Sequence, residues 1–274
     1  MTQHPSGQEA ILRAFAAAAA QHRAALITYL TLGYPSRAAS LELVPSLEAA
    51  GADIIELGVP FSDPVADGPV IQQASQCALA QDLTPSDCLS LVAELRAQGV
   101  SAPLVLMGYY NPIHSYGPKR YARRCAQAGV DGLIVPDLPP EEAGLLSTAC
   151  REHGIALIYL VAPTTDASRL SYVAEATQGF LYVVARLGTT GRGATSGAVL
   201  EEQLRAAKLV ARTPVAVGFG VSDPEQARRL AQQADGVIVG SAIVERAEQG
   251  CEAVEAFVSQ LREAMVRSPM HVTP

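Results

Sequence analysis

The chain has 274 residues with 49% hydrophobic and 17% charged residues, and its formal net charge is −7 at pH 7. This composition can fill a large buried core and argues against a nucleic-acid surface, which needs a basic footprint. The five cysteines are scattered, no apolar run is long enough to span a bilayer, and the N-terminus lacks a signal-peptide pattern, so we expect a soluble cytoplasmic protein without disulfides.

Short β-branched runs alternate with longer segments rich in Ala and Leu. An additional N-terminal helix is expected around residues 16–20. The expected strands are 25–30, 52–56, 104–107, 132–135, 156–161, 180–185, 215–217 and 236–239. The expected helices include 38–50, 88–98, 119–128, 141–153, 167–177, 200–211 and 224–233. Several of them end in Gly followed by an apolar residue, which is a common helix stop.

The expected strands are nearly continuous apolar runs, which is typical of a parallel sheet covered on both faces. Eight such strands, each followed by a helix, predict a (β/α)8 TIM barrel as one domain over residues 1–274. Its core would span about residues 24–267, followed by a short flexible C-terminal tail. A doubly wound open sheet is the alternative. In both folds the site lies at the C-terminal ends of the strands.

The run 54–69 carries the strongest chemical signal, because Glu56 stands at the end of a strand between Ile55 and Leu57. Burying an ionised carboxylate there is costly, so a raised pKa suited to proton transfer is one interpretation. A surface salt bridge at the strand end is the other, and the strand context alone does not separate them.

Glycines follow the seventh and eighth expected strands, in Gly218-Phe219-Gly220 and Gly240-Ser241. Glycine lets main-chain N–H groups approach a ligand closely, and a short helix is expected from Ser241 onward. Paired glycine sites at these two positions favour phosphate binding over simple strand ends.

Other segments are less decisive. The loop 186–197 contains four glycines and is either a mobile lid or a surface connection. Tyr182 lies within a strand, where an aromatic residue is more often core than catalytic. The loop 109–112 carries aromatics expected to be exposed, as an interface patch or as loop packing. The five histidines show no ligand spacing, so no metal site is expected.

With these motifs in view, the chain resembles the tryptophan synthase alpha subunit family over roughly residues 9–265. The most specific match is the block 56–69. Supporting blocks are 29–31, 107–112, 136–139, 218–221 and 240–244. The resemblance implies a (β/α)8 barrel that cleaves indole-3-glycerol phosphate by a retro-aldol reaction to indole and glyceraldehyde 3-phosphate.

The resemblance also implies roles for individual residues. Glu56 matches the general acid/base, Asp67 the carboxylate that pairs with the indole N–H, and Tyr182 a tyrosine near the glycerol portion. The remaining matches are Gly191, Gly220, Gly240 and Ser241 for the phosphate, Met107, Ile134 and Phe219 for the indole pocket, and Thr190 as the lid residue that touches Asp67. No cofactor is implied in this subunit. The implied partner is a pyridoxal-phosphate-dependent beta subunit in an alpha2-beta2 heterotetramer, and the implied substrate is indole-3-glycerol phosphate.

The chain departs from the family pattern at Tyr34, where Asp is common, in the segment 185–191, and at His114, where an aromatic is usual. Three hypotheses therefore remain. The chain works with a beta subunit, or it is a stand-alone lyase that releases free indole, or it is a non-catalytic barrel that binds and activates a partner. The intact Glu56 and Asp67 argue against the third.

Overall fold

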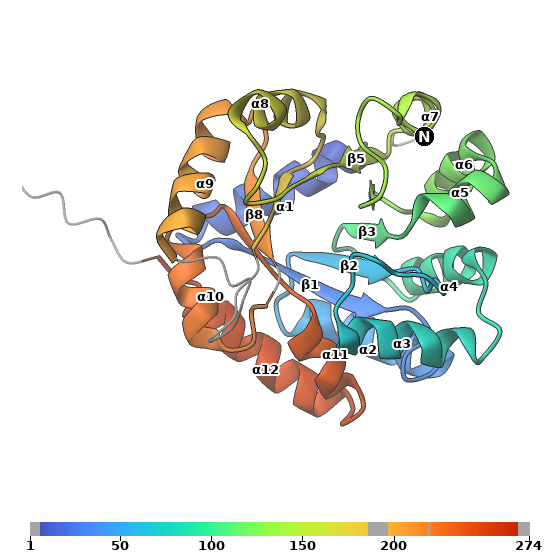
Figure 1. Cartoon of the computed structure of the whole chain (residues 1–274). Coiled ribbons are helices and arrows are strands. Elements are labelled where there is room, and N and C mark those ends of the chain that lie inside the picture. Colours follow the sequence, from blue (N-terminus) through green and yellow to red (C-terminus); the bar gives the residue numbers. More distant parts are fainter. Residues whose placement is uncertain (1–5, 186–196, 219, 268–274) are drawn as a thin grey trace, which may run out of the picture.

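The computed structural model describes residues 6–185, 197–218 and 220–267. Within these residues the chain forms one parallel sheet of nine strands enclosed by twelve helices (Figure 1). The strands are β1 (Ala25–Thr31), β2 (Ile54–Gly58), β3 (Leu104–Met107), β4 (Gly132–Ile134), β5 (Ala156–Ile158), β6 (Leu160–Val161), β7 (Leu181–Val184), β8 (Val215–Gly218) and β9 (Gly236–Val239). Their side chains are almost all buried, because one face packs inside the barrel and the other against helices.

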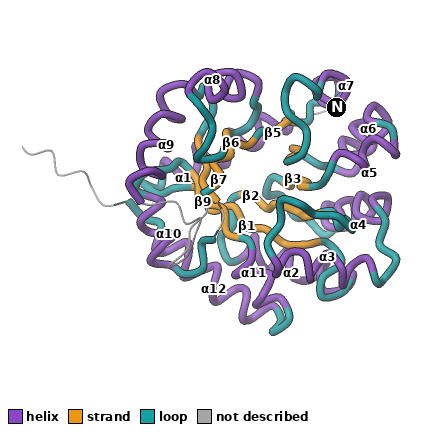
Figure 2. Tube along the Cα trace, in the orientation of Figure 1, coloured by secondary structure: helices purple, strands orange, loops and turns teal. Residues whose placement is uncertain are grey.

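Figure 2 shows the strands at the centre with the helices around them. The helices are α1 (Gly7–Ala20), α2 (Arg37–Ala49), α3 (Pro69–Leu79), α4 (Pro85–Ala97), α5 (Tyr110–Tyr116), α6 (Pro118–Ala128), α7 (Gly144–Glu152), α8 (Ala167–Ala176), α9 (Gly197–Val210), α10 (Pro224–Ala231), α11 (Ser241–Ala247) and α12 (Cys251–Ala264). No helix in the described ranges is both long and apolar enough to cross a membrane.

The sheet order is β5-β4-β3-β2-β1-β9-β8-β7-β6. Its two outer strands are separated by Tyr159 alone, and they pair with β4 and β7, so this one segment closes the barrel. The expected strand 156–161 is divided at Tyr159 into β5 and β6. There the Thr177 hydroxyl accepts the Tyr159 N–H at 3.0 Å and the Gln178 side chain accepts the Leu157 N–H at 3.1 Å. These side chains replace part of the main-chain ladder. The (β/α)8 prediction is confirmed, and the open sheet is excluded.

Helix α1 packs against the N-terminal ends of the strands, opposite the end where a barrel carries its site. It begins with a capping box, in which Ser6 and Glu9 each accept the other's N–H. Ile11 and Phe15 face strand-start glycines: a Cβ on Gly132 would lie 3.2 Å from Ile11, and one on Gly236 would lie 2.8 Å from Phe15. The glycines therefore leave room for the α1 side chains.

An aspartate fixes the N-terminal ends of three neighbouring strand pairs. Asp53, Asp131 and Asp235 each precede a strand and accept the N–H of the first or second residue of the adjacent strand, at 2.8, 2.8 and 2.9 Å. Each also pairs with a cation. Asp53 contacts Arg23 and Asp131 contacts Arg96, both at 2.5 Å, and Lys208 lies 2.9 Å from Asp235. Because these groups lie away from the strand C-termini, they act on stability and register.

Some boundaries differ from the sequence-based expectations. The second strand runs from Ile54 to Gly58, two residues later than predicted, so Glu56 lies within it. The helices α3, α5 and α12 were not predicted. The block 56–69 had been interpreted as strand and loop, and α3 begins at its final residue, Pro69, a residue favoured in a first helical turn.

Candidate active site

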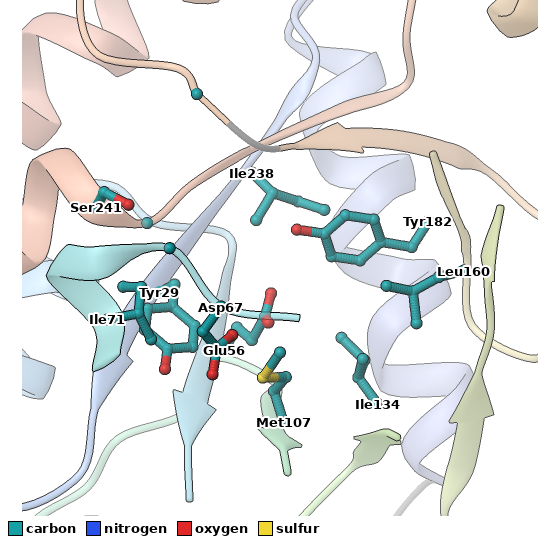
Figure 3. A pocket seen from close by; sticks show the side chains of 13 residues that line it. Tyr29, Glu56, Asp67, Ile71, Met107, Ile134, Leu160, Tyr182, Ile238 and Ser241 are labelled. Atoms are coloured by element: carbon teal, nitrogen blue, oxygen red, sulfur yellow. The ribbon is translucent and has the colours of Figure 1, made fainter. Parts of the chain in front are cut away.

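The C-terminal ends of the strands surround a pocket of about 210 Å³ (Figure 3). Side chains and glycines from several strands and from the loops that follow them form its wall. The lining residues are Tyr29, Glu56, Asp67, Gly68, Ile71, Met107, Ile134, Leu160, Tyr182, Gly220, Ile238, Gly240 and Ser241. The lining is mostly apolar, with a small number of polar groups, as is typical of ligand sites.

Glu56 provides a buried carboxyl group from the middle of β2. Its register partners are Tyr29 on β1 and Val105 on β3, and its side chain is only 3% exposed. Burial, and to a lesser degree the charge of Asp67, raises the pKa of Glu56 from 4.5 to about 8. Its Oε2 has no hydrogen-bond partner within the described ranges. Glu56 is therefore protonated at neutral pH and has an oxygen available to a ligand.

Asp67 reaches the same pocket from the loop between β2 and α3. Burial raises its pKa from 3.8 to about 6, and a hydrogen bond from the Tyr109 hydroxyl opposes that rise. Asp67 thus ionises at lower pH than Glu56. At neutral pH one carboxyl is protonated and the other is charged, an arrangement suited to acid/base chemistry.

Two buried tyrosines stand on either side of these carboxyl groups (Figure 3). The Tyr29 hydroxyl lies 3.2 Å from the Thr31 hydroxyl. It packs against Gly58, where an added Cβ would lie only 2.0 Å from the hydroxyl oxygen. The Tyr182 hydroxyl packs against Gly218 in the same way, and a Cβ added there would lie 2.6 Å from the hydroxyl oxygen. Burial raises the pKa of both tyrosines well above the usual value, so both keep their protons.

The remaining wall divides into an apolar part and a glycine-rich part. Met107 and Ile134 are register partners on β3 and β4, and Leu160 on β6 continues this surface (Figure 3). On the opposite side, Gly220 and Ser241 belong to the segments after β8 and β9. Gly220 has a φ of +80°, a conformation that glycine adopts readily. The pocket can thus hold an aromatic group on one side and a polar group on the other.

The structure brings most of the sequence-predicted site residues together. The residues that line this one pocket are Glu56, Asp67, Tyr182, Met107, Ile134, Gly220, Gly240 and Ser241. Thr190, Gly191 and Phe219 lie outside the described residues. The roles assigned to all of these residues remain predictions.

Sequence reasoning did not identify Tyr29, Ile71, Leu160 or Ile238 as pocket residues. A signal existed for Tyr29, because it lies within a strand next to the strand of Glu56 and two residues before its end. For Ile71 there was none, since α3 itself had not been predicted. Within the described ranges no three His, Cys, Asp or Glu side chains are grouped so as to hold a metal ion.

Fold and site together define a (β/α)8-barrel protein whose pocket combines two carboxyl groups of different pKa with glycine-rich strand ends. Comparison with known proteins narrows this class. The family model described as "Tryptophan synthase alpha chain" matches residues 15–271. The chain belongs to the tryptophan synthase alpha chain family.

Individual relatives agree. The tryptophan synthase alpha chain of Dehalococcoides mccartyi is 48% identical over 247 residues, covering 89% of this chain and 96% of the relative. That of a Roseiflexus species is 51% identical over 243 residues, covering 87% and 92%. Among solved structures, a chain of Mycobacterium tuberculosis tryptophan synthase matches with a TM-score of 0.86 and 39% identity, covering 93% of this chain and 98% of that one. The tryptophan synthase alpha chain of Legionella pneumophila matches with a TM-score of 0.85 and 38% identity, covering 93% and 97%.

Proposed function

We propose that the protein cleaves indole-3-glycerol phosphate to indole and glyceraldehyde 3-phosphate, as the alpha component of tryptophan biosynthesis. The observation that carries this proposal is Glu56: a buried carboxyl with a pKa of about 8 and an unpaired oxygen, facing an apolar pocket beside Asp67. Membership of the tryptophan synthase alpha chain family indicates which substrate to propose. The carboxyl supplies the proton that the reaction requires.

Two proton transfers account for the cleavage. Protonated Glu56 donates its proton to C3 of the indole ring, which leaves an indolenine cation. The resulting carboxylate then takes the proton of the hydroxyl on the adjacent side-chain carbon. As this carbon becomes an aldehyde, its bond to C3 breaks, and the electron pair returns to the ring to regenerate neutral indole. Glu56 ends protonated as it began, so one residue transfers both protons.

Asp67 and Tyr182 assist the reaction by binding two different parts of the substrate. Charged Asp67 accepts the indole N–H and stabilises the positive charge that develops on the ring when C3 is protonated. Tyr182 keeps its proton at all physiological pH values, so it can act toward the glycerol portion as a hydrogen-bond donor.

The two sides of the pocket match the two ends of this substrate. Met107 and Ile134 would hold the indole together with Phe219. Main-chain N–H groups near Gly220, Gly240 and Ser241 would hold the phosphate together with Gly191. Thr190 keeps its predicted role as the residue that contacts Asp67 when substrate is bound. An acidic protein can bind a phosphate in this way because the donors are main-chain groups.

We further propose that this subunit uses no cofactor, acts in the cytoplasm, and passes indole to a pyridoxal-phosphate-dependent beta subunit. The segments 59–63 and 109–114 are the proposed contacts with that partner. They pack on each other through Phe61 and Tyr109, whose ring centroids are 5.2 Å apart, while Ser62, Asp63 and His114 remain exposed. The similar chain from Mycobacterium tuberculosis comes from a crystal structure of tryptophan synthase, which supports this assignment.

An assay of indole release from indole-3-glycerol phosphate, with and without a beta subunit, tests the proposal. We expect slow release by the chain alone and faster release with the partner. Fast release without any acceleration indicates the stand-alone lyase. If no indole forms in either condition, or if Glu56→Gln releases indole as fast as the parent protein, the catalytic proposal is wrong and the non-catalytic barrel takes its place.

A further inference from the structure

Tyr109 lies two residues after the end of β3, where the sequence indicated only a loop with exposed aromatics. The structure buries Tyr109 to 3% exposure, and its ring lies against Phe61. Its hydroxyl oxygen accepts the main-chain N–H of Ala66 at 3.0 Å. Tyr109 therefore connects the loop after β3 to the loop after β2, which carries Asp67.

The same hydroxyl also interacts with the Asp67 side chain. Its oxygen accepts from Ala66, so its own proton remains available to the adjacent Asp67, and a side-chain hydrogen bond with Tyr109 lowers the pKa of Asp67. A hydrogen bond to a charged acceptor is about twice as strong as one between neutral groups. The hydroxyl thus holds both the backbone before Asp67 and the carboxylate itself.

Tyr109 is well placed for this role because its neighbours are fixed on both sides. The Gly108 N–H donates to the Ile134 carbonyl at 3.0 Å. The Tyr110 N–H donates to the Asp137 carboxylate at 2.9 Å, with the second carboxylate oxygen at 3.2 Å. The Tyr109 main chain is therefore anchored to β4 and to the loop that follows it.

The Asp67 loop has little packing of its own. Val65, two residues before Asp67, is 85% exposed. A turn bond from the Asp67 N–H to Pro64 at 3.1 Å and a bond from the Gln72 side chain to the Asp67 carbonyl at 2.9 Å hold the main chain. Neither contacts the Asp67 carboxyl. The hydrogen bond with Tyr109 is the one that acts on the Asp67 carboxyl itself.

We propose that Tyr109 is a positioning residue that holds Asp67 toward the pocket as a carboxylate, so that three loops at the barrel mouth are coupled to the charge that stabilises the reacting ring. This inference rests on the proposed cleavage of indole-3-glycerol phosphate. It predicts that loss of one hydroxyl changes the ionisation of a residue on another loop.

The expected direction follows from the groups that face Asp67. These are Glu56 on β2, Tyr29 on β1, Tyr182 on β7 and Tyr109 after β3. Burial raises the pKa of Asp67, and the Tyr109 hydroxyl is the group that opposes the rise. Without that hydroxyl the pKa of Asp67 increases, and the carboxylate is lost at a higher pH than in the parent protein.

The test compares Tyr109→Phe with Tyr172→Phe. Tyr109→Phe keeps the ring against Phe61 and removes only the hydroxyl. Tyr172→Phe is the same chemical change on α8, outside the pocket and the proposed partner contacts, where the residue is 46% exposed and the Arg169 guanidinium lies 5.5 Å from the ring centroid. For Tyr109→Phe we expect kcat for indole release to fall about tenfold with KM nearly unchanged, since one charge-assisted hydrogen bond is lost. We also expect the acid limb of the rate profile to move to higher pH. Tyr172→Phe should match the parent protein.

A double variant and a direct titration complete the test. In an Asp67→Asn background the further change Tyr109→Phe should have little effect, because the carboxylate it positions is already gone. A 13C NMR titration of the Asp67 carboxyl should show the raised pKa in Tyr109→Phe without any need for turnover. An unchanged titration, or the same loss of rate in both backgrounds, overturns the inference. Absence of indole release by the parent protein would instead reject the proposed function and leave the titration result standing.

Discussion

Asp67 and Glu56 lose their protons in a fixed order within one pocket. The pKa of Asp67 is about 6 and that of Glu56 is about 8, and the charge of Asp67 contributes to the higher value of Glu56. Between these values the pair carries one charge and one proton. Because burial is the main cause of both shifts, the barrel itself separates the two functions: the deeper group keeps its proton and the group nearer the loops is charged.

The rate of indole release should follow a bell-shaped dependence on pH. It should fall below about pH 6, where Asp67 becomes protonated, and above about pH 8, where Glu56 loses its proton. Asp67→Asn removes a negative charge beside Glu56 and should therefore lower the pKa of Glu56. The check is kcat/KM measured from pH 5 to 10 for both proteins. An alkaline limb that stays in place in Asp67→Asn would show that the two carboxyl groups are not electrostatically coupled.

Replacing Glu56 with Gln should reduce indole release by more than about a hundredfold, because the amide cannot donate and recover a proton. The same change should stabilise the fold at alkaline pH. The folded protein holds a proton on Glu56 up to about pH 8, whereas an unfolded Glu loses it near 4.5, so stability of the parent protein declines as pH rises between these values and then levels off.

Urea unfolding at several pH values tests the stability part of that prediction. The difference in unfolding free energy between Glu56→Gln and the parent should be small near pH 4.5 and should grow to about 2–5 kcal/mol at pH 8. Comparing the two proteins removes the similar contribution of Asp67. A difference that does not vary with pH would mean that Glu56 has an ordinary pKa in the folded protein.

The sequence predicted the barrel well because each strand–helix unit carries its own local signals. Apolar runs and glycine stops are encoded within a few residues, although β2 extends past Glu56, which was expected at its end. The interruption at Tyr159 could not be predicted in this way, because it depends on Thr177 and Gln178, which are distant in the chain and replace the strand's usual partners.

Within the site, the sequence pattern identified residues whose type is unusual in their local context. It missed residues whose role depends on contacts with other parts of the chain. Glu56 and the glycines after β8 and β9 were found because a carboxylate among apolar residues and paired glycines are unusual. Tyr109 was interpreted as an exposed loop aromatic, because its burial and its contact with Ala66 arise only when two loops from different strands meet. Tyr29 was missed although its position in the strand beside that of Glu56 was a signal.

Gly58 should be intolerant of a side chain, because a Cβ there would lie 2.0 Å from the Tyr29 hydroxyl oxygen and 2.6 Å from its ring carbon. Gly58→Ala must move Tyr29 within the pocket. We expect a loss of about 1–3 kcal/mol in unfolding free energy and a marked loss of activity. The control is Gly144→Ala at the start of α7, where no atom lies within 4 Å of a Cβ. Equal effects of the two variants would show that Tyr29 does not restrict Gly58.

The aspartates at the opposite end of the barrel should affect stability without affecting catalysis. Asp131→Asn leaves Arg96, which is 22% exposed, without its counter-charge and weakens the bond to the Leu104 N–H. We expect a loss of about 1–3 kcal/mol in unfolding free energy, with kcat and KM unchanged at 25 °C. In the control Glu94→Gln, the pair with Arg37 has both side chains more than 40% exposed, so the loss should stay below about 1 kcal/mol. Because Asp131 lies at the N-terminal end of β4, a change in kcat for Asp131→Asn would contradict the separation of stability and chemistry between the two ends of the barrel.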